Sequence, residues 1–257
     1  MLALITNDDG IASPGLVVLA RVAQAAGYDV VIAAPKAESS GASAALHGAE
    51  LDGRLMVEPA EPPGLPDGVR AFAVSADPAL ITFSAAYGAF GARPDLVLSG
   101  VNRGPNVGNA VLYSGTVGAA LAATSLGIRA VAVSLDAADP VHWDTAEQVA
   151  AHALAWFATV DAGRRTLNVN VPDLPPGELR GLRQAPLASF GAVHARVVPA
   201  DPLEAGRRGD DVVIRYEGTE RHTEPESDAG MLDAGWATAT LLVAPWADTT
   251  LAVPPLG

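Results

Sequence analysis

The chain has 257 residues, which fits one α/β domain with room for a smaller appendage. Its 16 basic and 29 acidic residues give a formal net charge of −13, and the basic residues are scattered, which argues against binding to nucleic acid polymers or to anionic membrane surfaces. The chain has no Cys, so disulfides, thiolate zinc sites and cysteine nucleophiles are excluded.

The first predicted elements form a strand–helix–strand unit. Residues 2–6 are an apolar strand, and Ser13 and Pro14 then open a helix as N-cap and first helical residue. Residues 30–34 form a second strand without polar positions. Continuously apolar strands joined through a helix are typical of a parallel sheet that is buried on both faces.

The alternation continues to about residue 175. We expect further strands over 54–59, 69–75, 95–99, 130–135 and 166–171, helices over 78–90, 116–126 and 144–160, and loops over 35–53 and 100–108. This order predicts an α/β fold of the Rossmann-like, doubly wound type with a mostly parallel sheet, covering residues 1–175.

The alternation of predicted strands and helices ends after Pro172. Strands are expected over 180–187, 192–198, 211–217 and 236–243, with a short helix over 227–234. We therefore expect residues 176–257 to form a β-rich C-terminal extension.

The N-terminus and the apolar runs bear on localisation. The chain reaches Asp8 too early for the apolar stretch of a signal peptide, and no apolar run approaches the roughly 20 residues of a membrane span. We expect a cytoplasmic protein.

Polar residues gather where three strands end. Ligands of open parallel sheets bind beyond the carboxyl ends of the strands, so these loops are candidates for one site. Asp8 and Asp9 are adjacent carboxylates that repel each other unless a cation or a proton intervenes, and hard oxygen ligands suit Mg²⁺, Mn²⁺ or Ca²⁺. The alternative is a turn in which both side chains cap backbone amides.

The other two loops offer uncharged groups. Ser40 and Gly41 combine a hydroxyl with closely approachable backbone, although taken alone they favour an ordinary Ser/Gly loop. Asn102 has an amide oxygen for a metal, and the alternative is a turn cap. Residues 114–116 lead into an Ala-rich helix, whose free N–H groups form an anion site without a basic side chain.

Several other motifs are missing. There is no Gly-Lys pair of a phosphate-binding loop and no G-x-G-x-x-G fingerprint, which disfavours an NAD(P)-dependent enzyme. The five His residues show no metal-binding spacing, so zinc is not expected.

Taken together, four stretches resemble the SurE family, the survival-protein-E type of 5′/3′-nucleotidase. They are residues 7–15 (NDDGIASPG), 40–43 (SGAS), 99–117 (SGVNRGPNVG running into YSGTV) and 168–172 (NVNVP), and residues 233–236 (DAGW) are similar to the family's closing segment. The order and spacing of the first three make the resemblance specific.

The resemblance implies a metal-dependent, acid-phosphatase-like phosphomonoesterase that hydrolyses nucleoside 5′-monophosphates, and in some cases 3′-monophosphates. It implies one divalent cation per subunit, Mg²⁺ or Mn²⁺, held by Asp8, Asp9, Ser40 and Asn102, with Asp8 and Asp9 as catalytic residues. We expect the phosphate to contact Gly41, Asn106, Ser114, Gly115 and Thr116. A homodimer or homotetramer with a C-terminal extension exchanged between subunits is also implied.

Two segments depart from the family pattern. Lys36 and Ala37 stand where the family usually has an Asp-Arg pair, and residues 75–79 (SADPA) replace its Gly-Thr-Pro-Ala-Asp stretch. These changes keep a second hypothesis open, a metal- or nucleotide-binding protein with altered or lost phosphatase activity.

Overall fold

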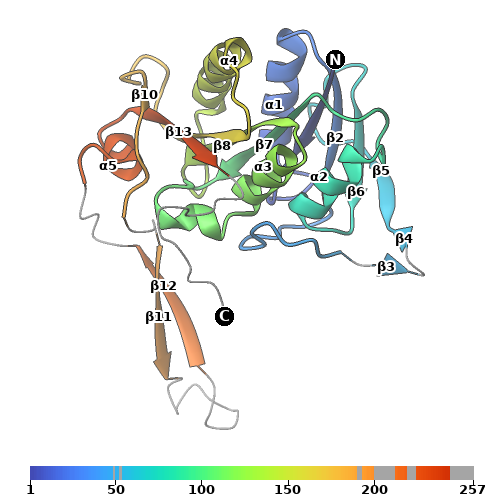
Figure 1. Ribbon diagram of the computed structural model, residues 1–257. Coiled ribbons are helices and arrows are strands. Elements are labelled where there is room, and N and C mark those ends of the chain that lie inside the picture. Colours follow the sequence, from blue (N-terminus) through green and yellow to red (C-terminus); the bar gives the residue numbers. More distant parts are fainter. Residues whose placement is uncertain (49, 52–53, 190–192, 200–211, 219–223, 244–257) are drawn as a thin grey trace, which may run out of the picture.

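The computed structural model describes residues 1–257 apart from 49, 52–53, 190–192, 200–211, 219–223 and 244–257 (Figure 1). One nine-stranded sheet organises the described part of the chain. Its strands, in spatial order, are β10 (Leu182–Gln184), β13 (Ala237–Val243), β9 (Arg165–Pro172), β8 (Arg129–Asp136), β7 (Leu96–Arg103), β1 (Leu2–Thr6), β2 (Asp29–Pro35), β6 (Arg70–Val74) and β5 (Val57–Ala60).

Six neighbouring strands of this sheet, from β9 to β6, are parallel. β5 pairs antiparallel with β6, and β13 pairs antiparallel with β9. Two short hairpins lie outside the sheet, β3 (Glu50–Leu51) with β4 (Arg54–Leu55) and β11 (Val193–Pro199) with β12 (Val212–Gly218). This is the α/β, mostly parallel architecture that the sequence predicts.

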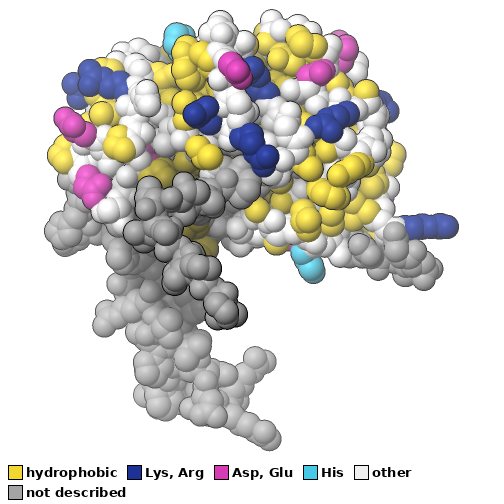
Figure 2. All heavy atoms as spheres, viewed as in Figure 1, with side chains coloured by type: hydrophobic (Ala, Val, Ile, Leu, Met, Phe, Trp, Pro, Cys, Tyr) yellow, Lys and Arg dark blue, Asp and Glu magenta, His cyan; other side chains and the backbone are white. Residues whose placement is uncertain are grey.

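Helices cover both faces of the sheet (Figure 1). One apolar core lies under α1 (Pro14–Ala25) and α4 (Trp143–Thr159), and a second lies under α2 (Pro78–Ala86) and α3 (Gly115–Ser125). The 3-10 helix η1 (Asn109–Leu112) precedes α3, and the short α5 (Asp228–Asp233) precedes β13. Hydrophobic side chains gather over α2 on the face shown in Figure 2.

The local signals for the first helix act as predicted. The Ser13 side chain accepts a hydrogen bond from the Gly15 N–H, and Pro14 occupies the first turn, where its missing N–H costs nothing. β2 is buried from Val30 to Pro35, which explains its lack of polar residues. In the part of the chain that the structure describes, no helix is long and apolar enough to cross a membrane.

Some predicted bounds are wrong. The strand that ends at residue 99 in the prediction continues to Arg103 as β7, and the helix predicted over 78–90 ends at Ala86. The predicted strand over 54–59 divides into β4 and β5, the expected loop before it contains β3, and the strand over 180–187 shortens to β10.

The predicted domain boundary at residue 175 falls between β9 and β10. Of the elements that follow it, β10 and β13 belong to the same sheet as the first 175 residues, whereas β11 and β12 form a separate hairpin.

Candidate active site

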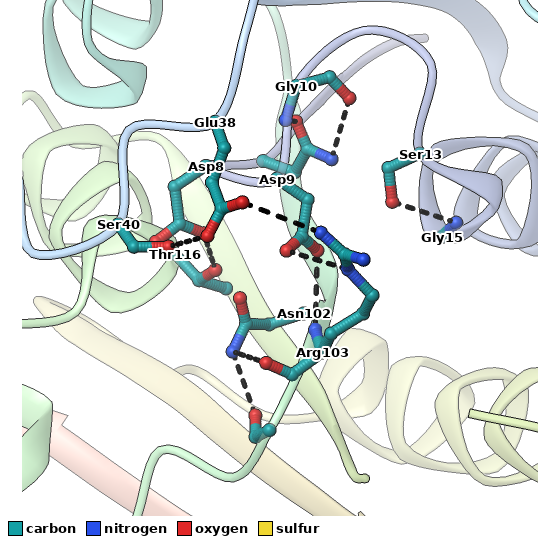
Figure 3. Close-up of polar contacts among 12 residues, drawn as sticks. Asp8, Asp9, Gly10, Ser13, Gly15, Glu38, Ser40, Asn102, Arg103 and Thr116 are labelled. Atoms are coloured by element: carbon teal, nitrogen blue, oxygen red, sulfur yellow. Dashed lines mark hydrogen bonds and ion pairs between the residues drawn. The ribbon is translucent and has the colours of Figure 1, made fainter. Parts of the chain in front are cut away.

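The candidate site lies where the winding direction of the sheet reverses. From β1 the sheet extends through β2 to β6 on one side and through β7 to β9 on the other. The loops after β1 and β2 meet the end of β7 at the carboxyl edge, the place where open α/β sheets bind ligands. Figure 3 shows side chains from all three segments and from the start of α3 gathered there.

The turn after β1 is closed by Asn7. Its side-chain amide donates to the Gly10 carbonyl, and the Gly10 N–H donates to its amide oxygen, each over 3.2 Å. Gly10 has φ +96°, and a Cβ there would lie 3.1 Å from the Ala37 carbonyl carbon. Only glycine fits this position, which brings the β1 turn against the loop after β2.

Asp8 is buried, with 4% of its surface exposed. Its Oδ1 accepts a hydrogen bond from the Thr116 hydroxyl, and a Cβ on Gly115 would lie 2.8 Å from its Oδ2. Burial raises the pKa of Asp8, while the Thr116 hydroxyl and the backbone amides of Thr116 and Gly115 act to lower it. The positive end of α3 therefore acts directly on this carboxylate.

Asp9 lies beside Asp8 and is held by Arg103. The Arg103 backbone N–H donates to Asp9 Oδ2 over 3.2 Å, and its Nε donates to Oδ1 over 3.3 Å. Burial first, and then the charge of Asp8, raise the pKa of Asp9 to about 6 against the opposing effect of Arg103. The combined effect of burial and of the neighbouring carboxylate on the Asp9 pKa thus exceeds the effect of the Arg103 charge.

Ser40 belongs to the loop after β2. Its hydroxyl donates to Glu38 Oε1 over 2.7 Å, and Glu38 Oε2 lies 3.7 Å from Arg103 Nη2. The Ser39 N–H donates to the Asp8 carbonyl over 2.8 Å, which fixes this loop to the β1 turn.

Asn102 is the second-last residue of β7, at the carboxyl edge of the sheet. Its amide nitrogen donates to the carbonyls of Arg103 and Gly104, and its oxygen points towards Asp8 and Asp9 (Figure 3). The pairing of β7 with β8 shifts register between Ser99 and Asn102, and Gly100 passes so close to Val133 that a Cβ would lie 2.2 Å from its carbonyl oxygen. This irregularity sets the direction of Asn102.

The structure places the residues predicted to bind phosphate in different ways. Ser114 caps α3 by accepting from the Val117 N–H over 3.0 Å, and Gly115 and Thr116 lie against Asp8. Gly41 is exposed with φ +84°.

Asn106 is buried and bound to two neighbouring strands. Its backbone N–H donates to Asn170 Oδ1, its carbonyl accepts from Asn168 and Asn170, and its side chain donates to Ser134. These bonds tie the loop after β7 to β8 and β9.

Sequence reasoning missed Arg103 and Glu38 as parts of this site. Arg103 directly follows Asn102 in a segment otherwise made of small and neutral residues, and this is the signal that could have marked it. Nothing in the local pattern distinguishes Glu38 from a solvated loop residue.

The donor set fits a divalent cation. Two carboxylates, one hydroxyl and one amide oxygen converge, and all are the hard oxygen donors that Mg²⁺ and Mn²⁺ take. Burial raises the pKa of both Asp8 and Asp9, and for Asp9 the charge of Asp8 adds to it, so a bound cation would favour the ionised form of each. Among the described residues, no group of three or more His, Cys, Asp or Glu is placed to hold a metal ion, so the donor set here rests on two carboxylates and two uncharged oxygens.

The two segments that depart from the family pattern line one cleft beside the site. Its volume is about 310 Å³, and its walls include Lys36 and Ala37 on one side and Ser75, Ala76 and Asp77 on the other. Lys36 pairs with Glu58 over 2.5 Å.

The fold and the site together define a Rossmann-like α/β protein with a cluster of hard oxygen donors at its topological switch point. The family model for survival protein SurE matches residues 3–192. This chain belongs to the SurE family.

Named relatives resemble the chain over most of its length. It is 36% identical over 242 residues to a 5′/3′-nucleotidase SurE of Proteus mirabilis, covering 93% of this chain and 88% of the relative. It is 38% identical over 229 residues to a 5′-nucleotidase SurE of Methylococcus capsulatus, covering 88% and 82%. The crystal structure of the SurE protein from Aquifex aeolicus is similar with a TM-score of 0.77 at 27% identity, covering 95% of this chain and 93% of that one.

Proposed function

We propose that this chain is a divalent-metal-dependent phosphomonoesterase that hydrolyses nucleoside 5′-monophosphates, and also 3′-monophosphates, to nucleoside and phosphate. The names of its relatives, 5′- and 5′/3′-nucleotidase, support the substrate class. The observation that carries the proposal is the buried Asp8–Asp9 pair, which faces the Asn102 oxygen at the switch point.

Asp8, Asp9, Ser40 and Asn102 would hold the cation. When bound, a divalent cation acidifies water and offsets the charge that builds up on a phosphoryl group. The chain's own contribution is to hold these oxygens in place before a cation binds. The bonds between Asn7 and Gly10, the Thr116 hydroxyl and the bond from the Ser39 N–H to the Asp8 carbonyl do this.

Asp8 is our candidate to orient and deprotonate the attacking water. Its Oδ1 is held by Thr116, so the carboxylate has a fixed direction from which to accept a proton. In the overall step the water oxygen bonds to phosphorus, the ester P–O bond breaks, and a proton passes to the leaving oxygen. Direct attack by an Asp carboxylate is the alternative. It forms an aspartyl phosphate, whose P–O bond water then breaks, and it predicts a phosphorylated aspartate that can be trapped during turnover.

The test is phosphate release from 5′-AMP, 3′-AMP and an aryl phosphate, with Mg²⁺, with Mn²⁺ and with EDTA. We expect release from 5′-AMP that needs the cation and stops in EDTA. Release that EDTA leaves unchanged contradicts the metal dependence. Cation binding without phosphate release from any of the esters favours the second hypothesis, a binding protein with altered or lost phosphatase activity. The residues that differ from the family pattern in the cleft, among them Lys36 and Ser75, would then account for the loss.

We also propose a cytoplasmic homodimer or homotetramer in which residues 176–257 exchange between subunits. Light scattering on the purified chain measures the assembly directly, and a monomer at all concentrations contradicts it.

A further inference from the structure

Arg103 links the two acidic parts of the site. Its Nε lies 3.3 Å from Asp9 Oδ1, and its Nη2 lies 3.7 Å from Glu38 Oε2. Glu38 in turn accepts the hydroxyl of Ser40. One guanidinium therefore reaches two residues of the proposed cation-binding set, Asp9 directly and Ser40 through Glu38 (Figure 3).

The local charges explain why this position matters. Asp8, Asp9 and Glu38 contribute three negative charges when ionised, and Arg103 is the one Lys or Arg side chain that pairs with any of them among the described residues. A divalent cation would bring the cluster to neutrality. Without the guanidinium, the same loaded cluster would carry a net negative charge and would repel a phosphate dianion.

The side chain is also free to change partners. Arg103 is 41% exposed, whereas the Asp9 side chain is 4% exposed, so the guanidinium covers the carboxylate from the solvent side. A phosphate ester that arrives from solvent would meet this group, and a planar guanidinium can bind two phosphate oxygens at once.

We propose that Arg103 stands in for the cation on Asp9 in the cation-free protein and binds the substrate phosphate once a cation is present. Glu38 tethers the guanidinium near the site throughout. This inference rests on the proposed function. It assigns phosphate binding to Arg103, and it is argued from the contacts of Arg103 with Asp9 and Glu38.

Two measurements on Arg103→Ala test it. The backbone N–H of residue 103, which donates to Asp9, is kept, so the change removes the guanidinium contacts. We expect the dissociation constant for Mn²⁺, measured by calorimetry without substrate, to fall on the order of tenfold, because a neighbouring positive charge is lost. We expect KM for 5′-AMP and the inhibition constant of inorganic phosphate to rise by about tenfold or more in saturating Mn²⁺.

Opposite movement of the two affinities is the diagnostic result. General damage to the site would weaken both, and an uninvolved side chain would change neither; each of these outcomes overturns the proposal. Arg103→Lys keeps the charge without the planar group and should give intermediate values. Glu38→Gln keeps an acceptor for Ser40 but removes a negative charge, so Mn²⁺ binding should weaken, and tighter binding contradicts the proposal.

Arg21→Ala is the matched control. Arg21 is 45% exposed and pairs with Glu147 over 2.6 Å on the helix layer of α1 and α4, and its loss should move neither affinity. A wild-type chain that binds no Mn²⁺ overturns the proposed function together with this inference. A wild type that binds Mn²⁺ and hydrolyses 5′-AMP, with an Arg103→Ala variant like Arg21→Ala, overturns this inference alone.

Discussion

At the scale of single residues, the main finding is that the Asp8 carboxylate lies against the N-terminus of α3. The sequence predicts that the free amides of residues 114–116 bind phosphate, and in the structure Gly115 and Thr116 lie against the Asp8 carboxylate. A helix N-terminus favours any anion, and the carboxylate is already there. Under the proposed function, the cation and Arg103 would therefore supply the positive charge that a substrate phosphate meets.

Asp8→Asn should therefore separate function from stability. We expect phosphate release to fall on the order of 100-fold or more, because the variant loses a negative ligand and a proton acceptor. The thermal midpoint in EDTA should not fall. Burial raises the pKa of Asp8, so its ionised form is less stable in the folded than in the unfolded chain, and a neutral amide removes that cost.

Asp29→Asn is the control for this change, because Asp29 is exposed at the start of β2, away from the carboxyl edge. It should keep full activity. An Asp8→Asn variant that hydrolyses 5′-AMP at the wild-type rate would remove Asp8 from the mechanism.

At the scale of elements, α3 and the loop after β2 pack closely where Gly118 meets Ser43. Ser43 donates its hydroxyl to the Leu112 carbonyl and its N–H to the Tyr113 carbonyl. Behind it, a Cβ on Gly118 of α3 would lie 2.1 Å from the Ser43 carbonyl oxygen. The loop that carries Ser40 is thus positioned by a helix residue without a side chain.

Gly118→Ala should destabilise the fold although it replaces Gly by Ala inside a helix. Helix propensity alone would favour Ala by about 1 kcal/mol, but the clash with backbone should cost about 1–3 kcal/mol or more. Urea unfolding measures the difference, and phosphate release should fall because the Ser40 loop moves. Gly177→Ala, where a Cβ meets nothing within 4 Å, should leave both unchanged. A Gly118→Ala variant as stable and active as wild type would mean that the loop adapts without cost.

Asp228 in α5 joins three segments that are distant in sequence. Its carboxylate accepts from the Gly108 N–H over 3.0 Å and from the N–H groups of Ala188 and Ala229 over 2.8 Å each. It is fully buried, and burial raises its pKa despite these donors. The loop after β7 therefore depends on a residue 120 positions later.

Asp228→Ala should lower the free energy of unfolding by at least about 2 kcal/mol, because it leaves buried backbone donors without partners. Chemical denaturation in EDTA measures this without a contribution from bound cation. Asp161→Ala removes an exposed carboxylate that accepts the Gly163 N–H, and it should change stability by less than about 0.5 kcal/mol. Equal effects of the two variants would contradict this view of Asp228.

Local signals predict most elements but not all of their pairings. Ser13 and Pro14 mark the start of α1, and the apolar runs mark the parallel strands. The continuation of β7 through Gly100 was missed because Gly and Asn indicate a loop, whereas Gly100 is needed for the close approach to Val133. The pairing of β13 with β9 joins residues some 70 positions apart, which no local pattern encodes.

The candidate site divides in the same way. Asp8, Asp9, Ser40 and Asn102 could be chosen because strand ends share one edge, and the structure brings them together there (Figure 3). The partners that hold them depend on side-chain contacts between separate loops. No local pattern predicts the bond from the Thr116 hydroxyl to Asp8, nor the contacts of Arg103 with Asp9 and Glu38.

At the scale of the whole molecule, cation binding should stabilise the fold. A ligand that binds only the folded state adds about 2.7 kcal/mol at one hundred times its dissociation constant, or roughly 5–10 °C in the thermal midpoint of a domain of this size. We expect Mn²⁺ to raise the midpoint of the wild type by this order. Asp9→Asn should abolish the shift, and a shift that survives in this variant would place the ion elsewhere.

The position of β13 has a consequence for how the protein is made. β10 touches the sheet only through β13, and β13 also covers the edge of β9. During synthesis, β9 and β10 leave the ribosome more than fifty residues before β13, so β9 stays an open edge strand in the meantime. Open edges recruit other chains. A message truncated after β12 would therefore yield a chain that aggregates, even though it contains every residue of the candidate site.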